Sequence, residues 1–426
     1  MARTAAEAGG AAGVGAFVRR GGFGRLWSAA AVSRFGDVLR GTALPLLAHA
    51  LTSDPLLIAL VTACGFAPWL LFGLLGGAIA DQVDQRRAMW AVDVLRGLLM
   101  GGFTLAVAAG AACIGLLLAL SFALTTLQTL FDNAATALLP AVVPRKSLTS
   151  ANARLMTGQE VVGRFVGGPV APLLIGVGAA LPFAVDAATY LIAAALVASL
   201  RTGAPPRPPA PSGGTLWREI AEGIRALWGD RALRGLCLSV ALANVGMGAL
   251  IAELVVVVKD WLGAGDFGYV AVTTGYGAGT VLGGLLVGHV VAAVGGRFRT
   301  LLVVGVVQTA VLVVFGTVRA LWPAALALAL FGCAGTVWNV LETTLVQQRA
   351  PEAMLGRISA AFRTVSIAGT PAGALLGGAA AVAWGPNSPA LVAAVLLGAG
   401  AVMLTPLVRA GDGTSSRRGQ IPHTTL

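Results

Sequence analysis

Charge is scarce in this 426-residue chain, since only 11% of the residues are charged and 57% are hydrophobic. An ordinary soluble domain carries roughly 25% charged residues, and one globular core cannot hide this much apolar surface. The abundance of hydrophobic residues also excludes a disordered chain. The sequence therefore predicts an integral membrane protein and not a water-soluble enzyme.

Cysteine is rare, and nucleotide-binding motifs are missing. The four cysteines all lie in apolar runs and form no C-x-x-C pair, which argues against a disulfide framework and a zinc site. No G-x-x-x-x-G-K-[ST] motif occurs to hold the phosphates of ATP. We therefore expect no metal, no cofactor and no ATP site.

The 29 basic residues exceed the 18 acidic ones and give a net charge of +11. In a soluble protein this excess would suggest a nucleic-acid partner. Here 25 of the 29 lie between apolar runs, 23 on one predicted side of the membrane and 2 on the other, and the remaining four lie within predicted spans. This asymmetry follows the positive-inside rule. It predicts a cell-membrane protein with both termini in the cytoplasm and no nucleic-acid partner.

Apolar runs of the length that a membrane helix needs, about 20 residues, recur along the whole chain. We expect spans near 26–49, 55–80, 87–109, 112–136, 155–178, 181–200, 233–257, 267–292, 299–318, 321–345, 359–384 and 388–408. They predict an all-α membrane protein with twelve transmembrane helices in two pseudo-symmetric six-helix halves. Glycines of the eighth span, Gly275, Gly277, Gly279, Gly283 and Gly284, indicate a close helix contact.

The domain organisation follows from these spans. It comprises a cytoplasmic tail at 1–25, a six-helix bundle at 26–200, a cytoplasmic linker at 201–232, a second six-helix bundle at 233–408 and a cytoplasmic tail at 409–426. The linker begins with a proline-rich stretch and continues into an amphipathic helix. That helix either lies in the membrane interface or packs on the bundle as a solvated helix.

The loop after the second span, Gly77-Ala-Ile-Ala-Asp-Gln-Val-Asp-Gln-Arg-Arg87, resembles the major facilitator signature G-x-x-x-D-R-x-G-R-R. Asp84 replaces the usual glycine, and the Asp93-Val-Leu-Arg96 run follows. Both features resemble the branch that contains macrolide efflux proteins and the enterobactin exporter. The resemblance implies the major facilitator fold, export of a small molecule by alternating access and no enzymatic activity.

A proton-driven transporter needs exchangeable charge within the membrane. The acidic residues within the predicted spans are Asp37, Asp93, Asp132, Glu160, Asp186, Glu253 and Glu342. The proton-coupling candidates are Asp37, Glu160 and Asp93, and their candidate charge partners are Arg34, Arg40, Arg96 and Arg164. Asp37 shares a helix face with Arg34 and with Arg40, because each is three residues away. A static, self-neutralising pair remains the alternative.

Two further groups complete the candidate site. Substrate-path candidates are Asp132, Glu342 and the pair Gly168–Pro169, which forms half of an antiporter signature. Asp132 and Glu342 are also compatible with an interfacial position near helix ends. A conformational latch in the signature loop is predicted from Gly77, Asp81, Asp84, Arg86, Arg87 and Arg357. In it, Asp81 would meet the start of the eleventh span at Arg357; turn formation and charge balance within the loop is the alternative.

These observations predict a proton-coupled exporter of a small amphipathic compound such as a drug, an antibiotic or a siderophore. Its partners would be that substrate, protons and membrane lipids, and we expect a monomer. Two alternatives remain: a proton-linked importer of a small solute, and a non-transporting membrane sensor or lipid scramblase.

Overall fold

The computed structural model describes residues 22–72, 84–143, 151, 154–155, 158–159, 162–200, 214–351 and 354–409. Within these residues the chain is helical throughout, with no strand. The all-α prediction is confirmed.

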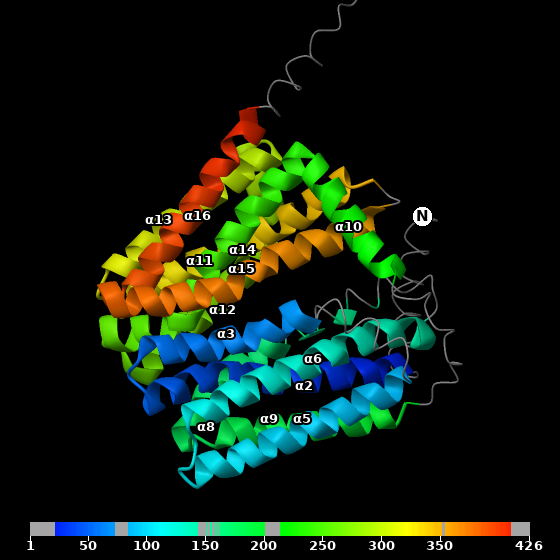
Figure 1. Cartoon of the computed structure of the whole chain (residues 1–426). Coiled ribbons are helices and arrows are strands. Elements are labelled where there is room, and N and C mark those ends of the chain that lie inside the picture. Colours follow the sequence, from blue (N-terminus) through cyan, green and yellow to red (C-terminus); the bar gives the residue numbers. More distant parts are fainter. Residues whose placement is uncertain are drawn as a thin grey trace, which may run out of the picture. The chain divides into compact units, whose positions relative to one another are not determined.

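The helices follow the predicted spans in order (Figure 1). In the first half they are α2 (Gly22–Leu51), α3 (Pro55–Phe72), α5 (Gln85–Ala108), α6 (Ile114–Val142), the π-helix η2 (Val162–Gly167), α8 (Gly168–Val177) and α9 (Leu181–Ala198). After α10 (Gly214–Gly229) come α11 (Arg231–Val256), the π-helix η3 (Val257–Trp261), α12 (Gly265–Val294), α13 (Arg297–Thr317), α14 (Leu321–Arg349), α15 (Leu355–Trp384) and α16 (Ser388–Met403).

Nine helices in the described part of the chain are long and apolar enough to cross a membrane. Two more predicted spans correspond to helices outside those nine. The helix α3 is short, since its apolar part runs from Pro55 to Trp69, and α2 carries Arg34, Asp37 and Arg40 along its middle. The remaining span, predicted at 155–178, contains the short segments η2 and α8. The helix order is thus consistent with twelve spans.

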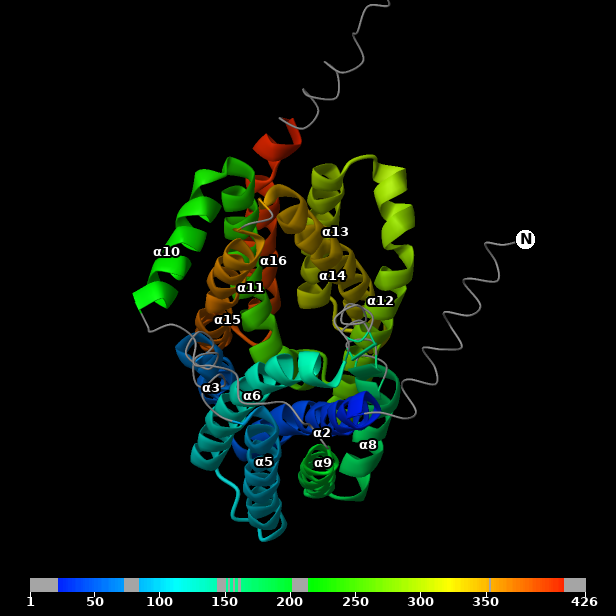
Figure 2. The same cartoon turned by 90° about the vertical axis from the view of Figure 1, so that its right-hand side faces the viewer.

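The chain divides into two compact units. Residues 1–51 with 64–210 form the first, and residues 52–63 with 211–426 form the second. In the first unit α9 packs against both α2 and α5, and α5 also packs against α6. These helices run side by side in both views (Figures 1 and 2). The first unit therefore places the middles of α2, α5, α6 and α9 together.

In the second unit, close helix pairs depend on glycine. A Cβ atom added at Gly275 would lie 2.9 Å from the Ala325 carbonyl oxygen of α14. One added at Gly279 or Gly283 would overlap the α14 backbone outright, whereas Gly277 faces open space. The predicted glycine contact is confirmed for the three positions spaced by four, which share one helix face.

The linker helix α10 packs against α15, also within the second unit. A Cβ atom at Gly223 would lie 2.6 Å from the Arg357 carbonyl oxygen, so the two backbones approach closely. Glu222 accepts a hydrogen bond from Arg357 Nη1 at 2.8 Å. The amphipathic helix predicted in the linker thus packs on the bundle at the start of α15. Ile224 and Trp228 remain exposed on it.

Candidate functional site

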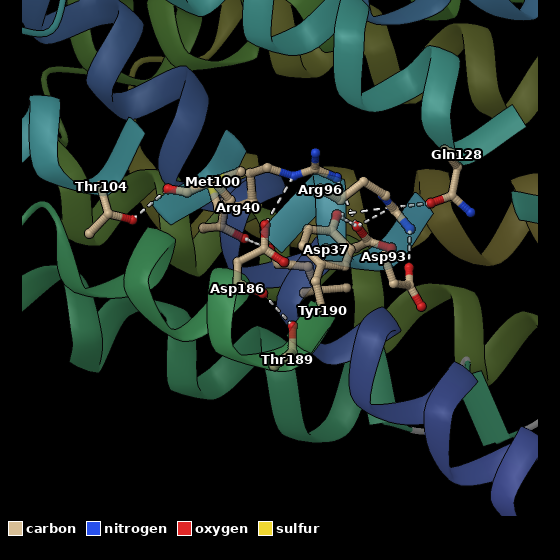
Figure 3. Close-up of polar contacts among 12 residues, drawn as sticks. Asp37, Arg40, Asp93, Arg96, Met100, Thr104, Gln128, Asp186, Thr189 and Tyr190 are labelled. Atoms are coloured by element: carbon tan, nitrogen blue, oxygen red, sulfur yellow. Dashed lines mark hydrogen bonds and ion pairs between the residues drawn. The ribbon is translucent and has the colours of Figure 1, made fainter. Parts of the chain in front are cut away.

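Four helices of the first unit bring charged and hydrogen-bonding side chains together within the predicted spans (Figure 3). We call this group the polar cluster. Its members are Asp37 and Arg40 of α2, Asp93 and Arg96 of α5, Gln128 of α6, and Asp186 and Tyr190 of α9.

Asp37 contacts three other members of the polar cluster. Its Oδ1 atom accepts hydrogen bonds from Arg40 Nη2 at 2.8 Å and from the Tyr190 hydroxyl at 2.6 Å. The Nη2 atom of Arg96 lies 3.5 Å from the same oxygen. One carboxylate therefore connects three helices, α2, α5 and α9.

Arg96 is fully buried and contacts four other members of the cluster. Its Nη1 atom donates to Asp93 at 3.2 Å, and its Nη2 atom donates to Gln128 and to the Tyr190 hydroxyl, the latter at 2.9 Å. Its guanidinium carbon lies 4.1 Å from the centroid of the Tyr190 ring, in cation–π geometry. The Tyr190 hydroxyl thus accepts from Arg96 and donates to Asp37, linking the cation to the carboxylate.

Asp186 completes the polar cluster, and Asp132 borders it. Asp186 Oδ2 lies 3.4 Å from Arg40 Nε. Asp132 accepts a hydrogen bond from Gln128 Nε2 at 2.7 Å, so it is connected to Arg96 through that amide. The sequence was compatible with an internal or an interfacial position for Asp132. Its contact with Gln128 places it beside the polar cluster.

The polar cluster is not neutral when every group is ionised. Asp37, Asp93 and Asp186 contribute three negative charges, and Arg40 and Arg96 contribute two positive ones. Asp93, Asp186 and Arg96 are fully buried, and burying an uncompensated charge is costly. One proton or one bound cation would balance these five groups, without counting Asp132, which borders the cluster through Gln128.

Access to the polar cluster is uneven. The Asp37 and Arg40 side chains are 14% and 19% exposed, whereas Asp93, Arg96 and Asp186 have no exposed side-chain surface. Asp37 is therefore the most accessible of the three carboxylates.

Gly36 lets α2 approach α9 at this level. A Cβ atom there would overlap the Thr189 hydroxyl and the Asp186 carboxylate, and it would lie 3.0 Å from the Asp186 Cα atom. The contact between Arg40 and Asp186 therefore depends on glycine at position 36, one turn before Arg40.

We expect Gly36→Ala to destabilise the protein by about 1–3 kcal/mol, as overpacking of a tight contact does. The matched control is Gly41→Ala on the same helix, because nothing lies within 4 Å of a Cβ atom at Gly41. The control should be neutral or stabilising, since alanine is the better helix former. Thermal unfolding in detergent measures both variants, and equal unfolding midpoints would contradict the close-contact explanation.

The remaining candidates of the first half lie apart from the cluster or outside the described residues. Arg34 is exposed on α2, and its Nε atom would be 3.6 Å from a Cβ atom at Gly163 of η2. Gly168 and Pro169 begin α8 directly after η2, where proline at the first turn suits its missing N–H. Arg164 belongs to η2, and Glu160 lies outside the described residues.

In the second half, the substrate-path candidate Glu342 lies on α14 and is partly buried. It belongs to the other compact unit of the chain. Glu342 is therefore not a member of the polar cluster, and its place in the substrate path stays a prediction.

The predicted latch is described only in part, because Gly77 and Asp81 lie outside the described residues. Asp84 caps the N-terminus of α5 by accepting from the Arg87 backbone N–H at 3.0 Å, which is turn chemistry. Arg86 donates to the Ala198 carbonyl oxygen at the end of α9. Arg357 binds Glu222 of the linker helix. The latch between Asp81 and Arg357 stays a prediction.

Gln128 and Tyr190 are the members of the cluster that the sequence did not single out. Both are uncharged, so a search for ionisable groups within spans passes over them. Tyr190 lies four residues after Asp186, one helical turn further along the same face of α9. That spacing is the pattern that would have found it.

Two helical units with a charged cluster inside the predicted spans are the architecture expected of a major facilitator transporter. The sequence matches the family described as transmembrane secretion effector over residues 13–423. The chain belongs to this family, and it is a multi-pass integral membrane protein and not an enzyme.

Curated relatives cover most of the chain. The enterobactin exporter EntS of Citrobacter koseri is 28% identical over 363 residues, which are 81% of this chain and 82% of that protein. The uncharacterized MFS-type transporter y4rN of Sinorhizobium fredii is 30% identical over 370 residues, which are 82% of this chain and 86% of that protein.

Solved structures share the fold. A mutant of the nucleoside transporter NupG superposes with a TM-score of 0.73 at 12% identity, covering 90% of this chain and 99% of that one. A bacterial homolog of the human lysosomal transporter Spinster, inward-facing and occupied, gives a TM-score of 0.71 at 14% identity, covering 91% and 96%. At these identities the likeness shows the fold alone. The predicted major facilitator fold is confirmed.

Proposed function

We propose that this transporter exports a small amphipathic molecule in exchange for protons and that Asp37 is the group that exchanges the proton. The polar cluster carries this proposal, because it holds three carboxylates against two guanidinium groups around one partly accessible acid. A bound proton neutralises the excess charge. Loss of that proton leaves Asp37 an acceptor for Arg40, Arg96 and Tyr190.

Such a site couples proton binding to conformation. Its contacts join α2, α5 and α9, so any movement between these helices changes the number of cations and hydroxyls around Asp37. A group whose charged form is stabilised differently in two states shifts the balance between those states when it binds a proton. Alternating access driven by a proton gradient needs this property.

The direction and the cargo class are supported by the relatives. Several relatives of this chain are named enterobactin exporters. We therefore place release of a siderophore or a chemically similar amphipathic compound ahead of uptake.

Purified protein in proteoliposomes with a trapped pH indicator tests this function. A pH gradient is imposed, and a panel that includes enterobactin, macrolides and other amphipathic compounds is added. We expect at least one compound to dissipate the gradient in protein-containing vesicles and not in empty liposomes. Cargo and proton moving in opposite directions supports exchange, whereas movement in the same direction supports an importer. If no compound dissipates the gradient, proton exchange is contradicted.

A further inference from the structure

The second half of the chain contains a buried acid that the polar cluster does not involve. Glu253 lies on α11 and has no exposed surface. Neither of its carboxylate oxygens has a hydrogen-bond donor within the part of the chain that the structure describes. Buried polar groups are nearly always hydrogen-bonded, so an acid without a donor calls for an explanation.

The helices around Glu253 present small apolar residues. A Cβ atom at Gly377 of α15 would lie 2.7 Å from the Ala249 Cα atom, one turn before Glu253. Ala252, the residue before Glu253, packs in a cluster of buried alanines with Ala59, Ala63 and Ala374. Alanine and glycine have no side-chain hydrogen-bond donor and no positive charge.

The charged groups of the packed helices do not compensate Glu253. The electrostatic interactions that reach it come from Asp54, before α3, and Asp260 of η3, both acidic. Lys259 of η3 is paired with Asp266 at 2.7 Å. Arg319, at the same end, stacks on the Trp261 ring of η3. The remaining charged residues of the packed helices lie away from that end: Arg231 and Arg234 at the start of α11, Arg357 and Arg363 at the start of α15, Glu342 and Arg349 at the end of α14, His289 near the end of α12, and Arg218, Glu219, Glu222 and Arg225 on α10.

An ionised carboxylate in this environment has neither a counter-charge nor a donor, which costs several kcal/mol. The neutral acid removes most of that cost. A metal ion does not fit, because Ca²⁺ and Mg²⁺ need about six oxygen ligands. No group of three or more His, Cys, Asp or Glu residues in the described chain is arranged to hold one.

We propose that Glu253 is a second proton-binding site. It belongs to the second unit of the chain, whereas the polar cluster belongs to the first. The conformation described here encloses the protonated acid among apolar residues. The proton leaves when the transport cycle brings water or a cationic group to the carboxylate. Its use in coupling rests on the proposed function of proton exchange, but its occupancy by a proton does not.

Infrared difference spectroscopy tests the occupancy without any cargo. The purified wild-type protein should show, at neutral pH, the carbonyl stretching band of a carboxylic acid that lacks a hydrogen bond. Glu253→Gln should lose this band. The control Asp266→Asn should keep it, because Asp266 is an exposed acid paired with Lys259. Identical carbonyl bands in wild type and Glu253→Gln would overturn the proposal.

Glu253→Met gives an independent readout of stability. A neutral acid in an apolar site is replaced by methionine with little loss, so thermal unfolding in detergent should stay at or above the wild-type midpoint. A large fall in that midpoint would mean that an ionised, partnered carboxylate had been removed, which contradicts a bound proton.

The proton-to-cargo ratio then tests the role in transport. In proteoliposomes we expect Glu253→Gln to move one proton fewer per cargo molecule than wild type or Asp266→Asn. An unchanged ratio, with the infrared band present, would restrict Glu253 to a static proton and overturn its coupling role. If wild type itself moves no proton with any cargo, the proposed function fails, while the infrared result still decides the occupancy.

Discussion

Replacing Asp37 with asparagine should uncouple transport while leaving the protein folded. Asparagine keeps an acceptor oxygen for the Arg40 and Tyr190 groups that now donate to Asp37. It removes one of the three negative charges, so that two carboxylates face two guanidinium groups and no proton is needed for balance. Gradient-driven cargo movement should fall by about 5- to 150-fold, the range that coupling free energies of about 1–3 kcal/mol give.

The measurement compares two rates in the same proteoliposomes. One is cargo-dependent dissipation of a pH gradient, and the other is cargo movement down its own gradient without a pH difference. The first rate should fall in Asp37→Asn, and the second should be retained. Asp266→Asn is the matched control, because it removes an exposed carboxylate in the other half of the chain. A wild-type proton-to-cargo ratio in Asp37→Asn would remove Asp37 from the mechanism.

The spans were predictable because hydropathy reports directly where a helix can lie in lipid. The ninth span, for instance, predicted at 299–318, is observed as α13 at Arg297–Thr317. The two π-helical segments were not predictable in this way: η2 lies inside the span predicted at 155–178, and η3 begins at the last residue of the span predicted at 233–257. Hydropathy does not distinguish a π turn from an α turn, because it averages over side chains and does not report which carbonyl each backbone N–H binds.

The choice between Arg34 and Arg40 shows what periodicity cannot decide. Both cations are three residues from Asp37, so the sequence made them equivalent partners. The structure pairs Asp37 with Arg40, which also lies beside Asp186 of α9, whereas Arg34 is exposed near η2. Contacts between distant helices made the difference, and a single sequence does not reveal which helices are neighbours.

The same limit explains the linker helix. Its amphipathic pattern predicted a helix, and the pattern was compatible with both the membrane interface and the bundle. Packing on α15 depends on Gly223, which brings the α10 backbone to Arg357, and on the ion pair between Glu222 and Arg357. Residues 134 or more apart in the sequence form these contacts, and local periodicity carries no information about them.

Arg96 is the residue whose loss should affect folding most. Arg96→Met removes the cation that forms the ion pair with Asp93, and it leaves three buried or partly buried carboxylates with Arg40 alone. Breaking a buried ion pair on one side typically costs about 3–5 kcal/mol. We expect the thermal unfolding midpoint in detergent to fall sharply, together with the yield of monodisperse protein.

A second substitution separates charge from packing. Adding Asp93→Asn to Arg96→Met leaves two carboxylates and one guanidinium group, which restores the wild-type excess of one negative charge. If uncompensated charge causes the loss, the double variant should recover a large part of the stability, although methionine gives up the stacking on the Tyr190 ring. Equal unfolding midpoints in the single and double variants would show instead that Arg96 stabilises the first unit mainly through its hydrogen bonds to Gln128 and Tyr190. In that case the balance of charge around Asp37 would not be what holds the four helices together.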